Sequence, residues 1–297
     1  MEDSDRDMEV QMMNYKDLIT RFTNWAKVQE TIQAAIVIGS RARTEVPADE
    51  WSDLDIILLT DTPEQFIDSE DWLENIHSYS ISFLEKTAVG DGIERRVMFN
   101  PHLDVDFVIL TPEYFSGMLQ IKEVQQVFQK GYKVLFDKTD VTNGIIVPED
   151  SAPVQLLPTQ TQFDNLVQDF WYHVVWVSKK MLRGEIWVAK ECLDSNLKNL
   201  VRVMAEWHAV SVLGNSPWHN GRFIENWADA RLVSCFSKMF AIYDRNSMFL
   251  AMKETMSIFR LLAVEVGESL NYPYPHQADQ AAERFLHTYQ ESIGSVK

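Results

Sequence analysis

The sequence predicts a mixed α/β domain followed by an all-helical domain, and three observations support this fold class. Within residues 1–140, short runs of aliphatic and β-branched residues alternate with segments of helical periodicity. Across residues 161–297, apolar side chains recur at helical spacing almost without interruption. Residues 141–160, which separate these halves, hold three prolines and no sustained periodicity, as is typical of a linker.

The first domain is expected to begin with an amphipathic helix over residues 15–30, because its apolar side chains share one face. Those side chains are Leu18, Phe22 and Trp25. Two strands are expected next, at residues 34–39 and 53–59. The run Thr62-Pro63-Glu64 then combines an N-cap, a proline at the first helical position and an acid in the first turn, so it predicts a further helix.

Four more strands complete the predicted sheet. They are expected at residues 79–84, 93–99, 104–110 and 132–136. Gly90-Asp91-Gly92 predicts a turn between the first two of these strands. Thr111-Pro112-Glu113 repeats the helix-start pattern and predicts a helix that extends to about Lys130. Strands and helices therefore alternate in a mixed arrangement.

The second domain is predicted to consist of helices packed on their apolar faces. One set of apolar residues shares a helix face, namely Phe163, Leu166, Val167, Phe170 and Val174. A second set does the same, namely Leu193, Leu197, Leu200, Val201 and Met204. Gly214 and Pro217 interrupt the pattern, and further helices are expected from about Ile224 to Val266.

The composition restricts the class of protein and its partners. The 297 residues include 27 Lys and Arg against 44 Asp and Glu, a formal net charge of −17 at pH 7. Nucleic-acid phosphates favour a basic surface, so this charge argues against a nucleic-acid partner, whereas it attracts a cationic substrate. The apolar runs are too short to span a membrane, and the acidic start does not resemble a signal peptide. We therefore expect a cytoplasmic protein without a membrane partner.

Metal-binding thiols and disulfides are not expected. Cys192 and Cys235 are too few for a disulfide framework, have no metal-ligand spacing, and are most simply interpreted as buried apolar residues. The seven histidines form no cluster with the spacing of a zinc site. The chemistry must therefore come from other side chains.

One motif stands out: Gly39-Ser40, twelve further residues, then Asp53-Leu54-Asp55. Gly39-Ser40 ends a predicted strand, where free backbone N–H groups and the Ser40 hydroxyl suit the phosphates of a nucleotide. Asp53 and Asp55 are two apart on a predicted strand, so their side chains project from the same face. Arg41 follows the turn and is expected to lie near the triphosphate.

Two carboxylates so close repel each other unless a cation lies between them, and Mg²⁺ is the natural candidate because it prefers oxygen ligands. A third acid, Asp106, lies on the predicted strand 104–110. If that strand neighbours residues 53–59, Asp106 completes a metal site or acts as a base. Asp104 shares its face, so the choice between Asp104 and Asp106 stays open.

This pattern is the signature of the DNA polymerase β-like nucleotidyltransferase superfamily, and its longer context resembles the aminoglycoside 6-adenylyltransferases, the streptomycin-modifying type. The resemblance extends over nearly the whole chain and is strict near the first motif. The segments that carry it are 38–41, 52–56 and 105–107, with 179–186 and 199–204 in the helical half.

The resemblance implies a nucleotidyltransferase domain over residues 1–140 and a helical substrate-binding domain over 161–297, with Mg²⁺ and ATP in the cleft between them. It also implies roles for individual residues. The metal ligands and catalytic acids would be Asp53, Asp55 and Asp106, and the nucleotide contacts would be Gly39, Ser40, Arg41 and Lys179. A single chain would suffice, because both sides of the cleft come from it.

The expected reaction is transfer of AMP from ATP to a hydroxyl of a streptomycin-type aminoglycoside, with release of pyrophosphate. Carboxylates of the helical half would meet the cationic substrate. The candidates are Glu185, Glu191, Asp194 and Glu206. The modified hydroxyl and the base of the nucleotide are not specified by any residue pattern.

Two alternatives remain open. In the first, the acceptor would be another small molecule or a protein. A protein is the acceptor of toxin–antitoxin-like nucleotidyltransferases. Arg202 and His208 of this chain resemble the Arg/His pair of the small helical ribonucleases that partner such enzymes. A non-catalytic nucleotide-binding module is the other alternative, against which the intact Gly39-Ser40 and Asp53-Leu54-Asp55 argue.

Overall fold

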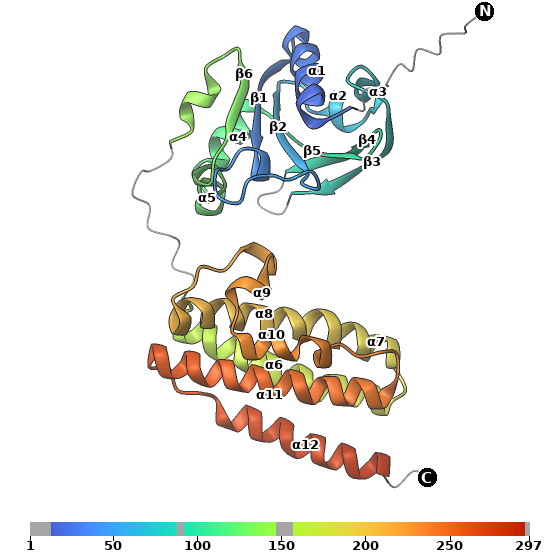
Figure 1. Cartoon of the computed structure of the whole chain (residues 1–297), viewed down its shortest axis with the longest axis vertical. Coiled ribbons are helices and arrows are strands. Elements are labelled where there is room, and N and C mark those ends of the chain that lie inside the picture. The colour runs from blue at the N-terminus through green and yellow to red at the C-terminus, as the bar shows by residue number, and fades with distance from the viewer. Residues whose placement is uncertain (1–12, 88–91, 147–156, 295–297) are drawn as a thin grey trace, which may run out of the picture. The chain divides into compact units, whose positions relative to one another are not determined.

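The structure is a computed structural model, and it describes residues 13–87, 92–146 and 157–294. The chain divides into two compact units, Met1–Ser151 and Ala152–Lys297, and each is described here by itself (Figure 1). The described part of the first unit combines a mixed sheet with helices, and that of the second is helical. The predicted fold class is therefore confirmed.

The described residues of the first unit form a six-stranded sheet in the order β3-β4-β5-β2-β1-β6. Its strands are β1 (Ile32–Ile38), β2 (Leu54–Thr60), β3 (Tyr79–Lys86), β4 (Ile93–Phe99), β5 (Leu103–Leu110) and β6 (Lys133–Asp137). β2 and β5 run parallel, whereas the other neighbouring pairs are antiparallel. The sheet is therefore mixed, and β2 and β5 are adjacent in it.

Side chains alternate between the two faces of the sheet, and helices cover both. One face packs on α1 (Tyr15–Val28), α2 (Glu64–Ile67) and α3 (Asp71–Glu74). An aromatic cluster fills this side: Phe22, Trp25, Phe66, Trp72 and Phe107. The opposite face of β1, β2 and β5 packs on α4 (Pro112–Met118) and α5 (Lys122–Gln129).

Toward β3 and β4 this second face is more exposed. Ile81 and Phe83 on β3 each expose 49% of their surface. The pairing register places Phe83 beside Arg96, Arg96 beside Asp106, and Asp106 beside Asp55. One row of side chains thus extends from the exposed edge of the sheet to the motif aspartates.

The run 62–64 was predicted to start a capped helix, and this prediction is wrong in its detail. α2 begins at Glu64 and makes a single turn, and the Thr62 side chain does not cap it. The Thr62 Oγ1 atom is buried without a hydrogen-bond partner, while the Thr62 N–H donates to Thr60 Oγ1 at 3.2 Å. The hydroxyl of Thr60 thus binds the backbone where a cap was expected.

The helix predicted to extend to Lys130 is two helices. Thr111 caps α4 as expected, by accepting from the Tyr114 N–H at 3.2 Å, but α4 ends at Met118 and α5 starts at Lys122. Ile121 adopts an extended conformation between them. This break turns α5 so that Phe128 meets Phe115 edge-on, with ring centroids 5.9 Å apart.

Two predicted connections lie partly outside the described residues. Of the predicted turn at 90–92, Gly90 and Asp91 are outside them, while the Gly92 carbonyl accepts from the Thr87 N–H at 3.0 Å. The predicted linker 141–160 contains a short 3₁₀ turn, Val141–Gly144, and its residues 147–156 lie outside the described residues. A helix begins at its last residue, Gln160.

The second unit is built around long helices that bury the predicted apolar faces. Its helices are α6 (Gln160–Leu182), α7 (Ile186–Glu191), α8 (Leu197–His208), α9 (Ile224–Trp227), α10 (Ala230–Met239), α11 (Arg245–Leu270) and α12 (His276–Gly294). Phe170 on α6 stacks on Phe259 of α11 with ring centroids 3.6 Å apart. π-helical turns, Cys192–Asn196 and Ala209–Leu213, lie on either side of α8.

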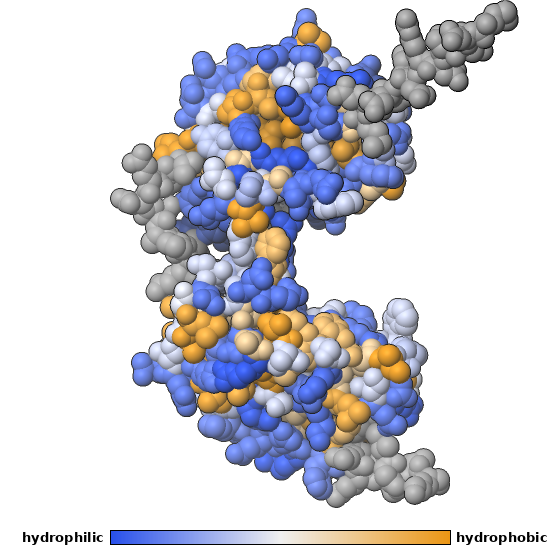
Figure 2. All heavy atoms as spheres, viewed as in Figure 1, coloured by the Kyte–Doolittle hydropathy of each residue, from blue (hydrophilic) through white to orange (hydrophobic). Residues whose placement is uncertain are grey.

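None of the described helices is long and apolar enough to cross a membrane. On the visible face of each unit, hydrophilic residues surround scattered apolar ones (Figure 2).

Candidate active site

The motif carboxylates come together at one edge of the β2–β5 pair. Asp55 lies on β2, Asp53 precedes that strand, and Asp106 lies on β5 directly opposite Asp55. The three side chains offer carboxylate oxygens that all lie within 4.8 Å of one another. Parallel pairing of β2 and β5 is what brings together acids that are far apart in the sequence.

The surroundings of Asp106 disfavour its charged form. Burial raises the pKa of Asp106 to about 6, the Arg96 guanidinium opposes this rise, and the carboxylates of Glu94, Asp53 and Asp104 add to it. A divalent cation among the three carboxylates would remove this repulsion. An all-oxygen donor set with room for phosphate ligands suits Mg²⁺, so the residues present fit that ion.

The structure separates the two candidates for the third acid. Asp104 is exposed, pairs in register with Met98, and lies outside the group of carboxylates that surrounds Asp55. Its backbone N–H donates to the Tyr15 hydroxyl at 3.1 Å. The geometry therefore favours Asp106, whose carboxylate is within the group.

Gly39 and Ser40 form a short 3₁₀ turn, η1 (Gly39–Arg41), directly after β1. Gly39 has a positive φ of +69°, a conformation that glycine adopts without strain. Ser40 is buried, and its hydroxyl donates to the Asp53 carbonyl at 3.4 Å. The turn is thus packed against the segment that carries the acids.

Arg41 binds the backbone that leads into β2. Its Nε donates to the Asp53 carbonyl at 3.0 Å, and Nη2 donates to the carbonyls of Asp49, at 3.3 Å, and Ser52. The guanidinium lies 3.4 Å from the centre of the Tyr15 ring. These contacts hold the position of Asp53, whereas a contact of Arg41 with the nucleotide stays a prediction.

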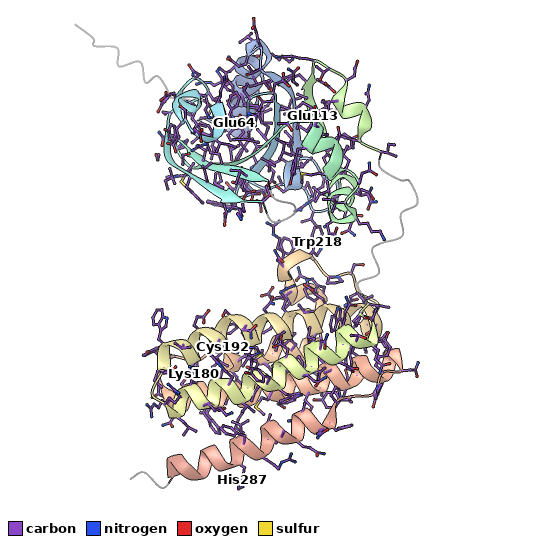
Figure 3. All side chains as sticks on the ribbon, turned by 180° about the vertical axis from the view of Figure 1, so that it is seen from behind. Glu64, Glu113, Lys180, Cys192, Trp218 and His287 are labelled. Carbon is purple, nitrogen blue, oxygen red and sulfur yellow. The ribbon has the colours of Figure 1, made fainter. Side chains whose placement is uncertain are left out.

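Lys179 belongs to the second unit. It is exposed on α6, and its Nζ lies 5.6 Å from the ring of Phe285 on α12. Its neighbour Lys180, labelled in Figure 3, forms an ion pair with Glu185, with Nζ 2.5 Å from Oε2. The same Nζ lies 5.1 Å from the centre of the Trp176 ring. The contact of Lys179 with phosphates stays a prediction.

Three of the four carboxylates expected to meet the substrate bind cations of their own chain. Glu185 binds Lys180 and Arg183, Asp194 binds Lys190, and Glu206 binds Arg202. The fourth, Glu191, accepts from the Ser195 hydroxyl at 3.4 Å. A substrate would have to compete with the first three partners.

Cys192, also labelled in Figure 3, is buried as predicted, whereas Cys235 is only partly buried. Burial raises the pKa of the Cys192 thiol to about 11. It is therefore a thiol rather than a thiolate at neutral pH.

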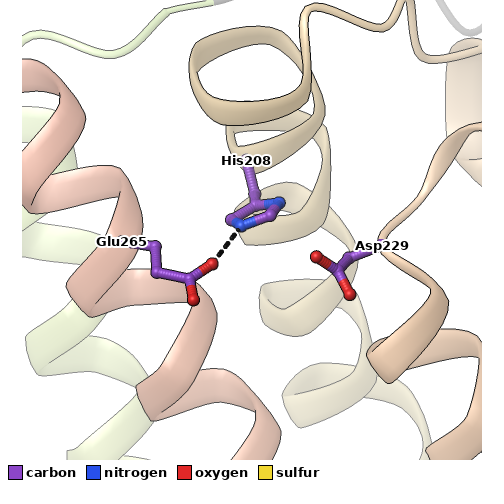
Figure 4. A group of neighbouring side chains, drawn as sticks. All are labelled: His208, Asp229 and Glu265. Atoms are coloured by element: carbon purple, nitrogen blue, oxygen red, sulfur yellow. Dashed lines mark hydrogen bonds and ion pairs between the residues drawn. The ribbon is translucent and has the colours of Figure 1, made fainter.

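A second group of metal-ligand types occurs in the helical unit (Figure 4). Buried His208 contacts Glu265 through Nε2 at 2.7 Å. Arg231 binds both carboxylates, Asp229 at 2.7 Å and Glu265 at 2.7 Å, and its hydrogen bonds hold the pKa of Asp229 at about 2. Because a guanidinium already neutralises both acids, this group is explained as an ion-pair network. His208 and Arg202 have different partners, since Arg202 binds Glu206.

Sequence reasoning did not select Arg96 or Glu94, which border the carboxylate group. Arg96 Nη2 lies 3.6 Å from Asp106 Oδ2 and 2.8 Å from Glu94 Oε1. Glu94 and Arg96 are two apart on a predicted strand, so the sequence did indicate that they share one face of the sheet. This indication became specific only once β4 was seen to pair with β5.

A mixed sheet that gathers three carboxylates beside a Gly-Ser turn, followed by a helical unit, defines the chain as an enzyme of the nucleotidyltransferase class. The chain belongs to the streptomycin adenylyltransferase family, whose model matches residues 12–289. The predicted family is therefore confirmed.

Curated relatives agree with this assignment. The chain is 26% identical to the aminoglycoside 6-adenylyltransferase of Bacillus subtilis (strain 168) over 275 residues, 89% of this chain and 94% of the relative. It is 24% identical to the enzyme of that name from Campylobacter jejuni, over 89% of this chain and 92% of the relative. The solved aminoglycoside 6-adenyltransferase from Bacillus subtilis aligns with 93% of this chain and 97% of its own at 19% identity and a TM-score of 0.44.

Proposed function

We propose that this protein transfers AMP from ATP to a hydroxyl of a streptomycin-type aminoglycoside and releases pyrophosphate. The observation that carries the proposal is the convergence of Asp53, Asp55 and Asp106, with oxygens within 4.8 Å of one another. The names of the curated relatives support an aminoglycoside as the acceptor.

Asp53, Asp55 and Asp106 would hold Mg²⁺, for which their oxygens are suitable ligands. When bound there, the ion would supply positive charge against the developing charge of the phosphoryl group and the departing pyrophosphate. The Gly39-Ser40 turn lies against this group through Asp55 and Asp53, which supports a role for it in binding the phosphates of the same nucleotide.

In this proposal the acceptor oxygen forms a bond to the α-phosphorus while the bond from that phosphorus to the bridging oxygen breaks. Pyrophosphate leaves with the electron pair, and the proton of the acceptor hydroxyl passes to a base. Where Asp53 and Asp55 alone hold the ion, Asp106 beside them is the candidate base. Positioning and electrostatics supply most of what such a transfer requires.

The acceptor is proposed to be cationic, in keeping with the formal net charge of −17. We assign nucleotide chemistry to the first unit and acceptor binding to the helical unit, in the cytoplasm, with one chain sufficient for activity. Lys179 and Arg41 are retained as candidate phosphate contacts.

The test is magnesium-dependent pyrophosphate release from ATP with streptomycin, kanamycin, gentamicin and a lincosamide in parallel. Release with streptomycin alone, lost in Asp55→Ala, would support both the chemistry and the acceptor class. Release with another member of the panel would keep the chemistry and change the acceptor. No release with any of them, from a folded protein that binds ATP, would direct the search to a protein acceptor or to a non-catalytic nucleotide-binding module.

A further inference from the structure

Arg96 lies beside the candidate catalytic acids on the exposed part of the sheet. It projects from β4 on the same face as Asp106, with which it pairs in register. Its Nη2 atom lies 3.6 Å from Asp106 Oδ2. The side chain is 43% exposed, so a ligand on this face would have access to it.

Two glutamates fix the guanidinium. Glu94 accepts from Arg96 Nε at 2.9 Å and from Nη2 at 2.8 Å, and Glu85 on β3 lies 3.0 Å from Nε. All contacts recorded between Arg96 and the described residues therefore use Nε and Nη2. Among the described residues, no acceptor contacts the N–H groups of Nη1, and the two glutamates fix their position.

The charges around this position indicate the kind of ligand that Nη1 would meet. Asp53, Asp55 and Asp106 repel the phosphates of ATP, so a preorganised donor to a phosphoryl oxygen nearby reduces the cost of bringing them together. Arg41 donates instead to three backbone carbonyls. Because Glu94 and Glu85 already offset the charge of Arg96, Nη1 offers a directional donor rather than net positive charge. A phosphoryl oxygen can accept from this donor, whereas a protonated amine of a cationic acceptor cannot.

We propose that Arg96 is a further catalytic residue, which donates from Nη1 to a non-bridging oxygen of the α-phosphoryl group, in the bound nucleotide and more strongly during transfer. The inference rests on the proposed function, since it assumes that the α-phosphorus lies beside Asp106. No proton leaves the guanidinium, and the bonds that form and break are those of the transfer itself. Glu94 and Glu85 are positioning residues, because they act through Arg96.

The first test compares Arg96→Gln with wild type in the pyrophosphate-release assay. Loss of one preorganised donor to transition-state charge typically lowers kcat by about 10²–10³-fold, with a smaller effect on the KM for ATP. Arg96→Lys is expected to be intermediate, because it keeps the charge and loses the planar donor geometry. Unchanged kcat in a folded Arg96→Gln protein would overturn the proposal.

Lys86→Gln is the matched control, since it removes one exposed positive charge from the end of β3. It is expected to retain activity near that of wild type. An equal loss in both variants would mean that net charge, and not the contact of Arg96, determines the rate. Thermal unfolding of both variants shows whether the sheet is intact.

Sulfur substitution at the α-phosphorus then tests the contact itself. Each diastereomer of ATPαS replaces one non-bridging oxygen, and sulfur is a weak hydrogen-bond acceptor. One diastereomer is expected to react more slowly with wild type for this reason, and this diastereomer-specific loss should shrink in Arg96→Gln while persisting in Lys86→Gln. Identical sulfur effects in wild type and Arg96→Gln would contradict the contact.

A binding measurement separates this inference from the proposed function. The analogue α,β-methylene-ATP keeps both non-bridging oxygens of the α-phosphoryl group, cannot release pyrophosphate and needs no acceptor. We expect its magnesium complex to bind several-fold more weakly to Arg96→Gln than to wild type. Equal affinity would contradict the role of Arg96 even if no aminoglycoside proves to be a substrate. A wild type that binds the analogue but releases no pyrophosphate would contradict only the proposed reaction.

Discussion

The carboxylate of Asp55 lies against the Cα atom of Gly39, where a Cβ atom would be only 2.0 Å from Asp55 Oδ2. The positive φ of Gly39, +69°, adds a second reason why a side chain is disfavoured there. Absence of a side chain at this position thus lets the turn after β1 and the acid on β2 approach each other.

We therefore expect Gly39→Ala to displace Asp55 and lower kcat by at least about 10²-fold, with strain of about 1–3 kcal/mol. Gly117→Ala is the control, because a Cβ at Gly117 in α4 meets nothing within 4 Å and alanine favours helices. The measurements are pyrophosphate release and thermal unfolding of both variants. Full activity in Gly39→Ala would show that Asp55 need not stay where the structure places it.

Asp106→Asn and Asp104→Asn test which acid completes the group. Both substitutions remove one negative charge, but only Asp106 has its oxygens among those of Asp53 and Asp55. We expect Asp106→Asn to lower kcat by about 10³-fold or more and Asp104→Asn to change it less than about threefold. The opposite order would assign the role to Asp104. Stability should not fall in Asp106→Asn, because the substitution removes repulsion between carboxylates.

Much of this group could be predicted from the sequence. Asp53 and Asp55 were found from their spacing, and Asp106 from its place on a strand with strong β character. Whether Asp104 or Asp106 completes the group depended on the neighbour of β5 and on the register of that pair, which are long-range properties. Local pattern cannot specify them.

Arg95 and Arg96 show the same limit. They are adjacent in the sequence, yet their side chains project from opposite faces of the sheet because side chains alternate along a strand. Arg95 lies on the buried face and binds Glu70 and the Phe66 carbonyl, whereas Arg96 lies on the other face, near Asp106. Nothing in the run of residues distinguishes a structural arginine from one that borders the acids. The carboxylates of the helical half were chosen for their charge, and partners on the same chain occupy most of them.

Arg41→Ala separates a backbone-holding role from a nucleotide contact. The substitution removes the donors to the Asp53 and Asp49 carbonyls and the contact with Tyr15. We expect a loss of about 1–3 kcal/mol in the free energy of unfolding and a lower kcat, with little change in the KM for ATP. A large increase in that KM, with stability unchanged, would instead support the predicted nucleotide contact of Arg41.

Arg231→Met tests the ion-pair network of the helical unit. The substitution leaves Asp229 and Glu265 without their cation, and since Arg231 is half-exposed we expect a loss of only about 1–2 kcal/mol at pH 7. Arg231 holds the pKa of Asp229 at about 2, below its ordinary 3.8, and lowers that of Glu265 from 4.5. Carboxylates whose pKa is lowered by folding stabilise the fold at pH values above the pKa that they have in the unfolded chain. This stabilisation is lost as the pH falls toward their pKa in the folded protein.

The difference in melting temperature between wild type and Arg231→Met should therefore shrink as pH falls from about 5 toward 3. Unfolding followed by circular dichroism across this range measures it. A constant difference would mean that Arg231 stabilises the fold through packing rather than through its charge.

Lys198 predicts a pH dependence of the opposite sign. Its Nζ donates to the Leu193 carbonyl at 3.1 Å and to Thr255 Oγ1 at 3.0 Å, at the join between the π-helical turn and α8. Burial lowers the pKa of Lys198 from 10.5 to about 8. The charged form is therefore disfavoured in the fold, and between pH 8 and 10.5 the unfolded chain binds more protons than the folded one.

Stability attributable to Lys198 should accordingly rise with pH across that window, by at most about 3 kcal/mol at 1.36 kcal/mol per pKa unit. Lys198→Met removes the titrating group, so the expected result is loss of this slope. The two lost hydrogen bonds lower the stability of the variant by the same amount at every pH. Urea unfolding of both proteins at pH 7, 8, 9 and 10 separates the effect of titration from that of the hydrogen bonds, because hydrogen-bond loss shifts all four values equally. Parallel curves for wild type and Lys198→Met would show that the ammonium group is solvated in the folded chain, and that burial at this join does not penalise it.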